Sequence, residues 1–264
     1  MVTRIVFNDV SFEYTKGKKI LHNINLTLDR PGLTCIIGPN GVGKSTLIKI
    51  INKLLIPSSG FVSINGKDVK EMSRKEIAEL IAFVPVGFAD VFSMNVVDTV
   101  LIGRHNKNKW KTSDNDIAVV KKTLDVMGMG AYSDRTYSEL SAGQCQKINI
   151  ARGLAQETKV LLLDEPTANL DVKHQIYVTE LLRDIAIRNN LSVIMISHDL
   201  NIASKFADTL VMMSKPGVIH AVGQPDDIIT SDNIFNVYGA HSNIVEHEGR
   251  PAVLLSYMID DVLE

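Results

Sequence analysis

The sequence predicts an α/β fold with a mostly parallel sheet, and a few features of the chain support this. Three short apolar runs, at residues 33–37, 160–163 and 192–197, each lead directly into glycine or polar residues. Segments with a helical spacing of apolar residues lie between them. Strands of a parallel sheet are buried on both faces, so they read as continuous apolar runs joined by helices. Ligands bind where the carboxyl ends of such strands meet, so the residues after the three runs are candidates for one site.

The first run leads into a phosphate-binding loop. Glycine-rich residues follow the run, and an apolar-periodic segment at 47–51 follows them, which reads as strand, tight loop and helix start. Backbone N–H groups and the positive helix end attract phosphate oxygens, Lys44 adds an ammonium near the β and γ phosphates, and the Ser45 hydroxyl suits Mg²⁺. A chance glycine turn carrying a lysine is a much weaker reading of the complete pattern. The predicted nucleotide-binding residues are Gly38, Pro39, Asn40, Gly41, Val42, Gly43, Lys44, Ser45 and Thr46.

The second and third runs end in groups that suit phosphoryl transfer. The run at 160–163 is followed by Asp164 and Glu165. One carboxylate can belong to the Mg²⁺ shell, which fits Asp164, and the next can accept a proton from the attacking water, which fits Glu165. His198 follows the run at 192–197. An acidic loop or a solvated histidine is the ordinary reading of each feature alone, but their shared position after three strands favours a common site.

A second anion site is predicted far from the phosphate loop along the chain. Ser141 precedes a segment whose apolar residues recur with helical spacing, so its side chain can cap the helix start. Free N–H groups and the positive end of the helix dipole then face outward beside Gly143 and Gln144. One chain with two phosphate-binding helix ends far apart in sequence implies that a γ phosphate bound by the loop of one copy is contacted by the second helix end of another copy.

The remaining patterns divide the chain into segments. Residues 2–30 read as short strands with a turn at 16–18, and residues 61–66 read as a hairpin. The pattern is helical from about 87 to 155, and the tail from 243 reads as a small hairpin with an end segment. We expect a single domain over 1–264. Its core comprises about 1–86 and 156–240, a helical subdomain occupies about 87–155, and a C-terminal tail occupies 241–264.

Together these motifs resemble the nucleotide-binding subunit of an ATP-binding cassette (ABC) transporter, nearly end to end. The loop at 38–46 resembles the Walker A motif, 161–165 the Walker B motif, 140–144 the signature motif and 168–171 the D-loop. The resemblance implies a P-loop NTPase (RecA-like) core with an antiparallel β subdomain and an inserted α-helical subdomain. L-S-x-G-Q is weak as a bare pattern, but it is decisive between a Walker A and a Walker B motif.

The resemblance also implies roles for individual residues. Tyr14 occupies the place of an aromatic residue that stacks on adenine, although a tyrosine before a turn is otherwise ordinary. Ser141, Gly143, Gln144 and Asp171 join the nucleotide site, and His198 is the switch histidine. ATP and Mg²⁺ are the implied cofactors, with Ser45 and Asp164 holding the metal. The implied mechanism uses Glu165, His198 and Lys44 for hydrolysis.

The functional unit implied by the resemblance is a head-to-tail homodimer. Two ATP molecules lie between the Walker A motif of one copy and the signature of the other. Segments at 97–104, 150–156, 198–201 and 237–239 resemble those of importers for metal chelates, a group that handles ferric siderophores, haem, cobalamin and, in some members, molybdate or tungstate. This resemblance implies an integral-membrane permease dimer as partner, and indirectly an extracytoplasmic substrate-binding protein.

Three other functions share some of these motifs. A cytosolic ABC ATPase that acts on ribosomes or DNA usually has two cassettes or a long coiled-coil insertion, and the chain has neither. A simple P-loop kinase would lack the signature. A weakly hydrolysing regulatory subunit is suggested by Val86, because the family has a glutamine there that contacts Mg²⁺ and water. An apolar side chain can do neither. Our hypothesis is a working ATPase with weakened coupling.

Composition narrows the partners. The chain has 264 residues, 45% of them hydrophobic, and a net charge of −2, which gives no bulk attraction to nucleic acid. The basic run at 107–111 reads better as a solvated loop than as a binding patch. Two cysteines without metal-ligand spacing suggest a reducing compartment. Since no apolar stretch approaches the ~20 residues of a membrane span, we expect the cytoplasmic face of the membrane, with contact through partner chains.

Overall fold

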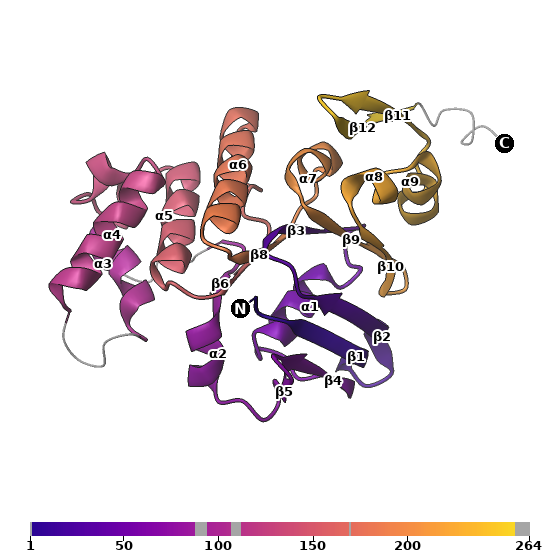
Figure 1. The fold of residues 1–264 in the computed structure, drawn as a ribbon, viewed down its shortest axis with the longest axis horizontal. Helices are drawn as coiled ribbons and strands as arrows, with labels where there is room; N and C mark the ends of the chain where they lie inside the picture. The colour runs from indigo at the N-terminus through magenta and orange to yellow at the C-terminus, as the bar shows by residue number, and fades with distance from the viewer. Residues whose placement is uncertain (1, 88–93, 107–111, 169, 257–264) are drawn as a thin grey trace.

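The protein is built on a six-stranded sheet that is parallel except at one edge (Figure 1). The computed structural model describes residues 2–87, 94–106, 112–168 and 170–256. The strand order is β10-β9-β3-β8-β7-β6, and only β10 runs antiparallel to its neighbour. The predicted mostly parallel α/β fold is confirmed. The strands are β3 (Gly32–Ile37), β6 (Ile81–Val84), β7 (Val160–Leu163), β8 (Ser192–Ile196), β9 (Thr209–Ser214) and β10 (Val218–Gly223).

The central strands bury side chains on both faces, which explains their continuous apolar sequence. Alternate residues of each strand enter two separate cores, so that Leu161 lies in one core and Leu162 in the other. One core lies under α6 (Val172–Arg188) and α7 (Leu200–Phe206), and the other packs against α1 (Lys44–Ile51). In Figure 1 these helices lie above and below the sheet. Layers of helix on both faces hold the strand ends, and therefore the loops that follow them, in fixed places.

An antiparallel sheet covers α1. Its order is β2-β1-β4-β5, from β1 (Ile5–Thr15), β2 (Lys18–Leu28), β4 (Ser59–Ile64) and β5 (Lys67–Asp68). The predicted turns at 16–18 and 65–66 are confirmed, and Gly17 and Gly66 have the positive φ angles that such turns require. Two strands of 11 residues form where the sequence suggested several short ones. Bulges in the β1–β2 register interrupt the strict alternation that would have marked one long strand.

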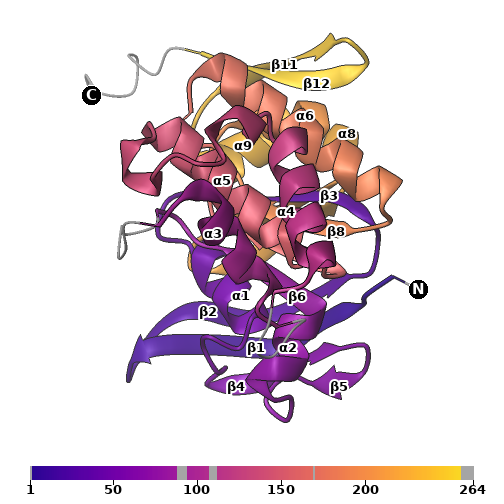
Figure 2. The same cartoon turned by 90° about the vertical axis from the view of Figure 1, so that its left-hand side faces the viewer.

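The helical part projects from one end of the main sheet and faces the viewer in Figure 2. It contains α3 (Val96–Leu101), η1 (Ile102–Arg104), α4 (Asp114–Val126), η2 (Gly130–Tyr132), η3 (Tyr137–Glu139) and α5 (Ala142–Ala155). Asn95, Ser113 and Ser141 cap the three α-helices through their side chains, which confirms the cap predicted at Ser141. The basic run at 107–111 lies outside the described residues.

The remaining elements surround the main sheet. Helix α2 (Arg74–Leu80) precedes β6, whereas α8 (Pro225–Ile228), α9 (Ser231–Tyr238), β11 (Ser242–His247) and β12 (Arg250–Leu255) form the C-terminal part. The predicted C-terminal hairpin is confirmed, and the end segment from 257 lies outside the described residues. Asn201 on α7 fixes the position of β12 through two hydrogen bonds, since its side-chain amide donates to Val253 O and accepts from Val253 N. Within the described parts of the chain, no helix is long and apolar enough to cross a membrane.

Candidate functional site

The phosphate loop connects β3 to α1 in a shape that requires glycine at two positions. Gly38 has φ +147°, and a Cβ there would lie 2.4 Å from the carbonyl oxygen of Met213. Gly43, at the start of α1, has φ +101°, and a Cβ there would lie 2.6 Å from Leu21. Both positions therefore exclude other residues through sterics as well as backbone conformation. The loop is held close to its neighbours at both ends, which leaves backbone groups between them to face a ligand.

The Lys44 side chain is buried within the loop that it follows. Its ammonium donates hydrogen bonds to Gly38 O at 2.7 Å and Pro39 O at 2.9 Å. Burial lowers the pKa of Lys44, and the nearby charges of Glu165 and Asp164 oppose that effect. The positive charge thus lies between the loop carbonyls and the two acidic residues at the end of β7.

Ser45 and Asp164 meet at the start of α1, as expected for a shared metal site. The Ser45 hydroxyl donates to Asp164 Oδ1 at 2.9 Å, and the backbone N–H of Asp164 donates to Val84 O. Asp164 is only 4% exposed, and burial raises the pKa of its carboxyl. Hydroxyl and carboxylate oxygens suit Mg²⁺, which typically takes one or two carboxylates and completes its shell with water and phosphate oxygens. The side chains present therefore fit this ion.

Glu165 and His198 meet at the ends of neighbouring strands. Since β7 and β8 are parallel and Leu163 pairs with Met195, the residues after them meet at one edge. His198 Nε2 lies 2.5 Å from Glu165 Oε1, and both side chains are partly exposed. Glu165 has φ +50°, a conformation that a non-glycine residue adopts at a cost of about 1 kcal/mol or more. Such strain is common where a side chain is aimed at a ligand.

Tyr14 lies beside the phosphate loop with much of its ring exposed. Its hydroxyl is 3.2 Å from Thr46 Oγ1, and its ring meets Phe12 edge-on at 4.8 Å between centroids. The side chain is 59% exposed, far more than an aromatic residue that serves the core. Tyr14 therefore has an open ring beside the phosphate loop, which is the arrangement needed for stacking.

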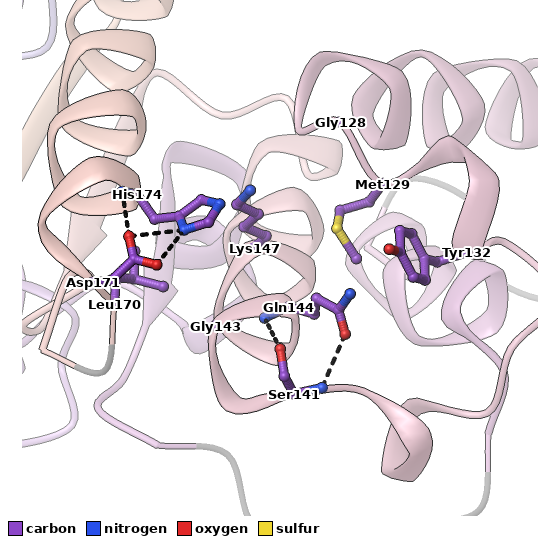
Figure 3. Close-up of a pocket in the computed structure, with 10 residues that line it drawn as sticks. All are labelled: Gly128, Met129, Tyr132, Ser141, Gly143, Gln144, Lys147, Leu170, Asp171 and His174. Carbon is purple, nitrogen blue, oxygen red and sulfur yellow. Dashed lines mark hydrogen bonds and ion pairs between the residues drawn. The ribbon is translucent and has the colours of Figure 1, made fainter.

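The signature residues form a separate cavity of about 350 Å³ (Figure 3). Ser141 caps α5 reciprocally with Gln144, since Gln144 N donates to Ser141 Oγ and Ser141 N donates to Gln144 Oε1. The described lining of this cavity includes Gly143 and Asp171 but no residue of the phosphate loop. The structure thus brings Lys44, Ser45, Asp164, Glu165 and His198 together in one place, and Ser141, Gly143, Gln144 and Asp171 in another.

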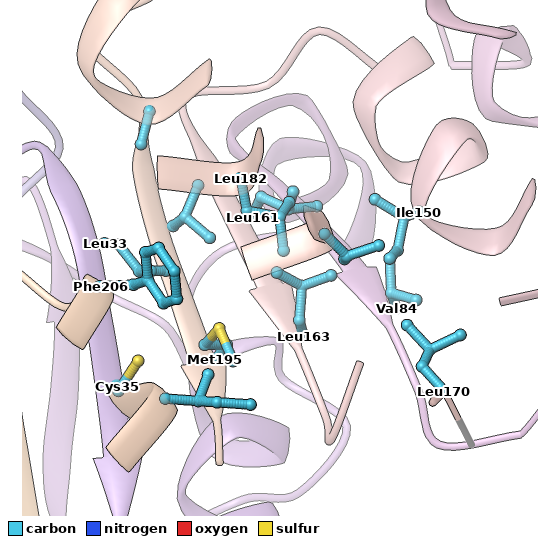
Figure 4. Close-up of a cluster of buried hydrophobic side chains, with 14 of the residues drawn as sticks. Leu33, Cys35, Val84, Ile150, Leu161, Leu163, Leu170, Leu182, Met195 and Phe206 are labelled. Carbon is cyan, nitrogen blue, oxygen red and sulfur yellow. The ribbon is translucent and has the colours of Figure 1, made fainter. Parts of the chain in front are cut away.

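Leu170 of the predicted D-loop lies in the core beside the signature residues. Leu170 packs in the cluster that contains Val84 and Ile150 (Figure 4), and a Cβ on Gly143 would lie 3.1 Å from Leu170 Cδ2. Asn169 of the predicted D-loop lies outside the described residues. Val86 follows β6 and is 47% exposed, so the side chain that replaces the expected glutamine lies at the surface.

Sequence reasoning missed two basic side chains of the signature cavity. Lys147 and His174 both line it, and His174 Nδ1 lies 2.9 Å from both carboxylate oxygens of Asp171. The sequence signal that could have revealed these two residues was their position relative to predicted site residues. His174 lies three residues after a predicted site residue at a helix start, and Lys147 lies six after Ser141.

A model of the ABC transporter family matches residues 21–168, which include the phosphate loop, the signature and Asp164 with Glu165. The chain belongs to the ABC transporter family. It is an ATPase whose hydrolysis of ATP is coupled to transport, and the recognised resemblance is confirmed.

Two curated relatives and one solved structure show the family similarity over most of the chain. An uncharacterized ABC transporter ATP-binding protein of Methanocaldococcus jannaschii is 42% identical over 93% of the chain and 95% of its own length. A cobalamin import ATP-binding protein of Halobacterium salinarum is 35% identical over 92% of the chain, which spans 61% of that relative. A putative metal-chelate type ABC transporter in an inward-facing conformation superposes with a TM-score of 0.83, at 27% identity over 98% of this chain and 99% of that one.

Proposed function

We propose that the protein is the ATP-hydrolysing subunit of an importer for a metal chelate or a metal oxyanion. Ferric siderophores, haem and cobalamin are the chelates in view, and a separate permease dimer at the membrane is the partner. The ATPase binds the cytoplasmic face of that permease, and an extracytoplasmic binding protein delivers the cargo. The cobalamin-import relative and the metal-chelate type structural neighbour support this class over a cytosolic ABC ATPase.

The separation of the two phosphate-binding helix ends carries the proposal of a head-to-tail homodimer. The phosphate loop with its acidic residues lies apart from the signature cavity, and each place holds only part of a nucleotide site. A second copy in head-to-tail orientation supplies each loop with a signature. Two-fold symmetry then forms two complete sites at once. Tyr14 stacks on the adenine of the ATP bound to its own copy.

Hydrolysis depends on charge placement around the γ phosphate. Glu165 accepts a proton from the attacking water. His198, whose Nε2 lies 2.5 Å from Glu165 Oε1 in the structure, donates to a γ-phosphate oxygen once ATP is bound, which leaves the carboxylate to the water. Lys44 offsets the charge that develops on the phosphate oxygens. Mg²⁺, when bound, neutralises phosphate charge, and Ser45 and Asp164 are the residues that hold it. Asp171, the last residue of the predicted D-loop, lines the signature cavity.

A glutamate-to-glutamine substitution tests the mechanism. Glu165→Gln keeps the size of the side chain but removes its basicity, so we expect ATPase activity to fall at least about 100-fold while ATP binding persists. Closed dimers should then accumulate with ATP and be visible as a doubled mass in size-exclusion chromatography with light scattering. Normal turnover by this variant would overturn the assignment of Glu165 as the base.

A pull-down tests the importer class independently. We expect the tagged protein to copurify with a multi-spanning membrane protein from detergent-solubilised membranes. Reconstitution of that complex in vesicles should give ATP-dependent uptake of a chelate. Recovery of ribosomes in place of a permease would favour the cytosolic alternative.

A further inference from the structure

The signature cavity contains a histidine whose orientation is fixed by a carboxylate. Asp171 caps α6 by accepting from the backbone N–H of His174 at 2.9 Å. The ring Nδ1 of the same histidine lies 2.9 Å from both Asp171 oxygens, and Figure 3 shows the ring at the cavity beside Lys147. An ionised carboxylate only accepts hydrogen bonds, so Nδ1 carries the proton. The second ring nitrogen, Nε2, is the one left for a ligand.

The charges around the cavity favour an anion. Lys147 lines it from α5, and its ammonium lies 5.4 Å from the centroid of the Tyr177 ring on α6. Asp171 is the one acidic side chain of the described lining, and its oxygens are engaged by His174. The hydrogen bonds from His174 lower the pKa of Asp171, so the carboxylate stays ionised beside the ring. The N-terminal turn of α5, with Ser141 and Gly143, adds its positive dipole end.

We infer that His174 is a further nucleotide-binding residue, which contacts the phosphate chain of the ATP held by the other copy. This inference rests on the proposed head-to-tail dimer. Phosphate oxygens draw a second proton onto the ring, and Asp171 stabilises the resulting imidazolium through Nδ1. Nε2–H then donates a charge-assisted hydrogen bond to the phosphate. In this arrangement Asp171 acts through His174, as a positioning residue.

The test compares variants in the Glu165→Gln background, which separates dimer formation from hydrolysis. The measured quantity is the ATP concentration that gives half-maximal dimer in light scattering. We expect His174→Gln to raise it about tenfold or more, because a hydrogen bond to a charged group is lost in each of two sites. His174→Arg retains a cationic donor and should restore most of the response. His174 is 44% exposed, so these variants should fold normally.

Lys173→Gln is the matched control. It removes a positive charge from the adjacent position of α6 but does not line the cavity, so it should change the ATP requirement less than twofold, as expected for a screened surface charge.

A pH series provides a readout that a merely structural role would not change. The titratable groups around the ring are Asp171 on its own element and Lys147 and Tyr132 in the cavity lining, while Tyr177 lies beside Lys147 and Lys173 lies outside the lining. Dimer formation by the parent should depend on pH more strongly than that of His174→Gln, because only the parent carries the imidazole that donates to phosphate.

The outcomes separate the two proposals. If the Glu165→Gln parent forms no dimer with ATP, the head-to-tail site fails and this inference fails with it. If the parent dimerises and His174→Gln needs the same ATP concentration with the same pH response, only the role of His174 is overturned.

Discussion

At the scale of single residues, the buried carboxylate of Asp164 lowers the stability of the nucleotide-free protein at neutral pH. Its carboxylate is almost fully buried, and Ser45 stabilises the charged form only in part. Burial is the larger effect, so the pKa of the folded carboxyl lies above that of the unfolded chain. The folded protein therefore binds this proton more tightly. The associated stability is present below the unfolded pKa and is lost as pH rises through the folded pKa.

Asp164→Asn should therefore stabilise the nucleotide-free protein at neutral pH. The amide keeps an oxygen for the Ser45 hydroxyl without carrying a buried charge. We expect a gain of about 1 kcal/mol, or about 2–4 °C in Tm, together with loss of ATPase activity. Thermal unfolding from about pH 4 to about pH 8 checks the sign, because the gain should grow as pH rises. A gain that is constant with pH would show that the carboxylate is not the cause.

The sequence anticipated the meeting of these residues because each follows a strand. Glu165 and His198 lie together since β7 and β8 are neighbours in a parallel sheet, and Ser45 reaches Asp164 since β3 lies on the other side of β8. Their catalytic roles stay predictions. His174 was missed because its importance depends on the side-chain contact with Asp171, and three-residue spacing alone is common at helix starts.

At the scale of elements, a buried arginine joins three parts of the helical subdomain. Arg104, at the end of η1, donates to Asp116 on α4 at 2.9 Å, to Ala155 O at the end of α5 and to Glu157 at 2.6 Å. Gly103 allows the close approach, since a Cβ there would lie 2.3 Å from Arg152 O. The junction lies just before β7, which leads to Asp164.

Arg104→Met should destabilise the protein strongly. It removes a buried charged partner of the Asp116 carboxylate, which we expect to lower the free energy of unfolding by about 3 kcal/mol. Urea denaturation followed by circular dichroism measures this change. Glu157→Gln is the control, because that carboxylate is half exposed and its loss should cost less than about 1 kcal/mol. Equal costs for the two variants would contradict a junction centred on Asp116.

Element prediction was most complete where a motif or an apolar run marked the element. The helices α3, α4 and α5 lie in the stretch that the sequence predicts to be helical, and the strands of the main sheet are rich in apolar residues. Helix α6, by contrast, received no assignment, although Val178, Leu181, Leu182 and Ile185 recur with helical spacing and pack in or against the core. The signal for α6 was therefore present in the sequence.

At the scale of the whole molecule, the remaining question is how hydrolysis is linked to the permease. Val86 follows β6, and the backbone of the same strand is tied to the metal site through the hydrogen bond from Asp164 N to Val84 O. The position is thus close in the chain to both the site and the helical subdomain. Its exposed isopropyl side chain offers no donor or acceptor to a metal-bound water.

Val86→Gln should therefore strengthen coupling in the assembled transporter. A glutamine can donate to and accept from water near the metal, so we expect the permease-stimulated ATPase rate to rise by about two- to tenfold, which one added hydrogen bond can supply. Val86→Leu is the matched control, because it changes size without adding a polar group. Rates are measured for the ATPase alone and for the complex with its permease in vesicles. If glutamine changes neither rate, position 86 does not limit coupling, and the link must run through other contacts of the helical subdomain.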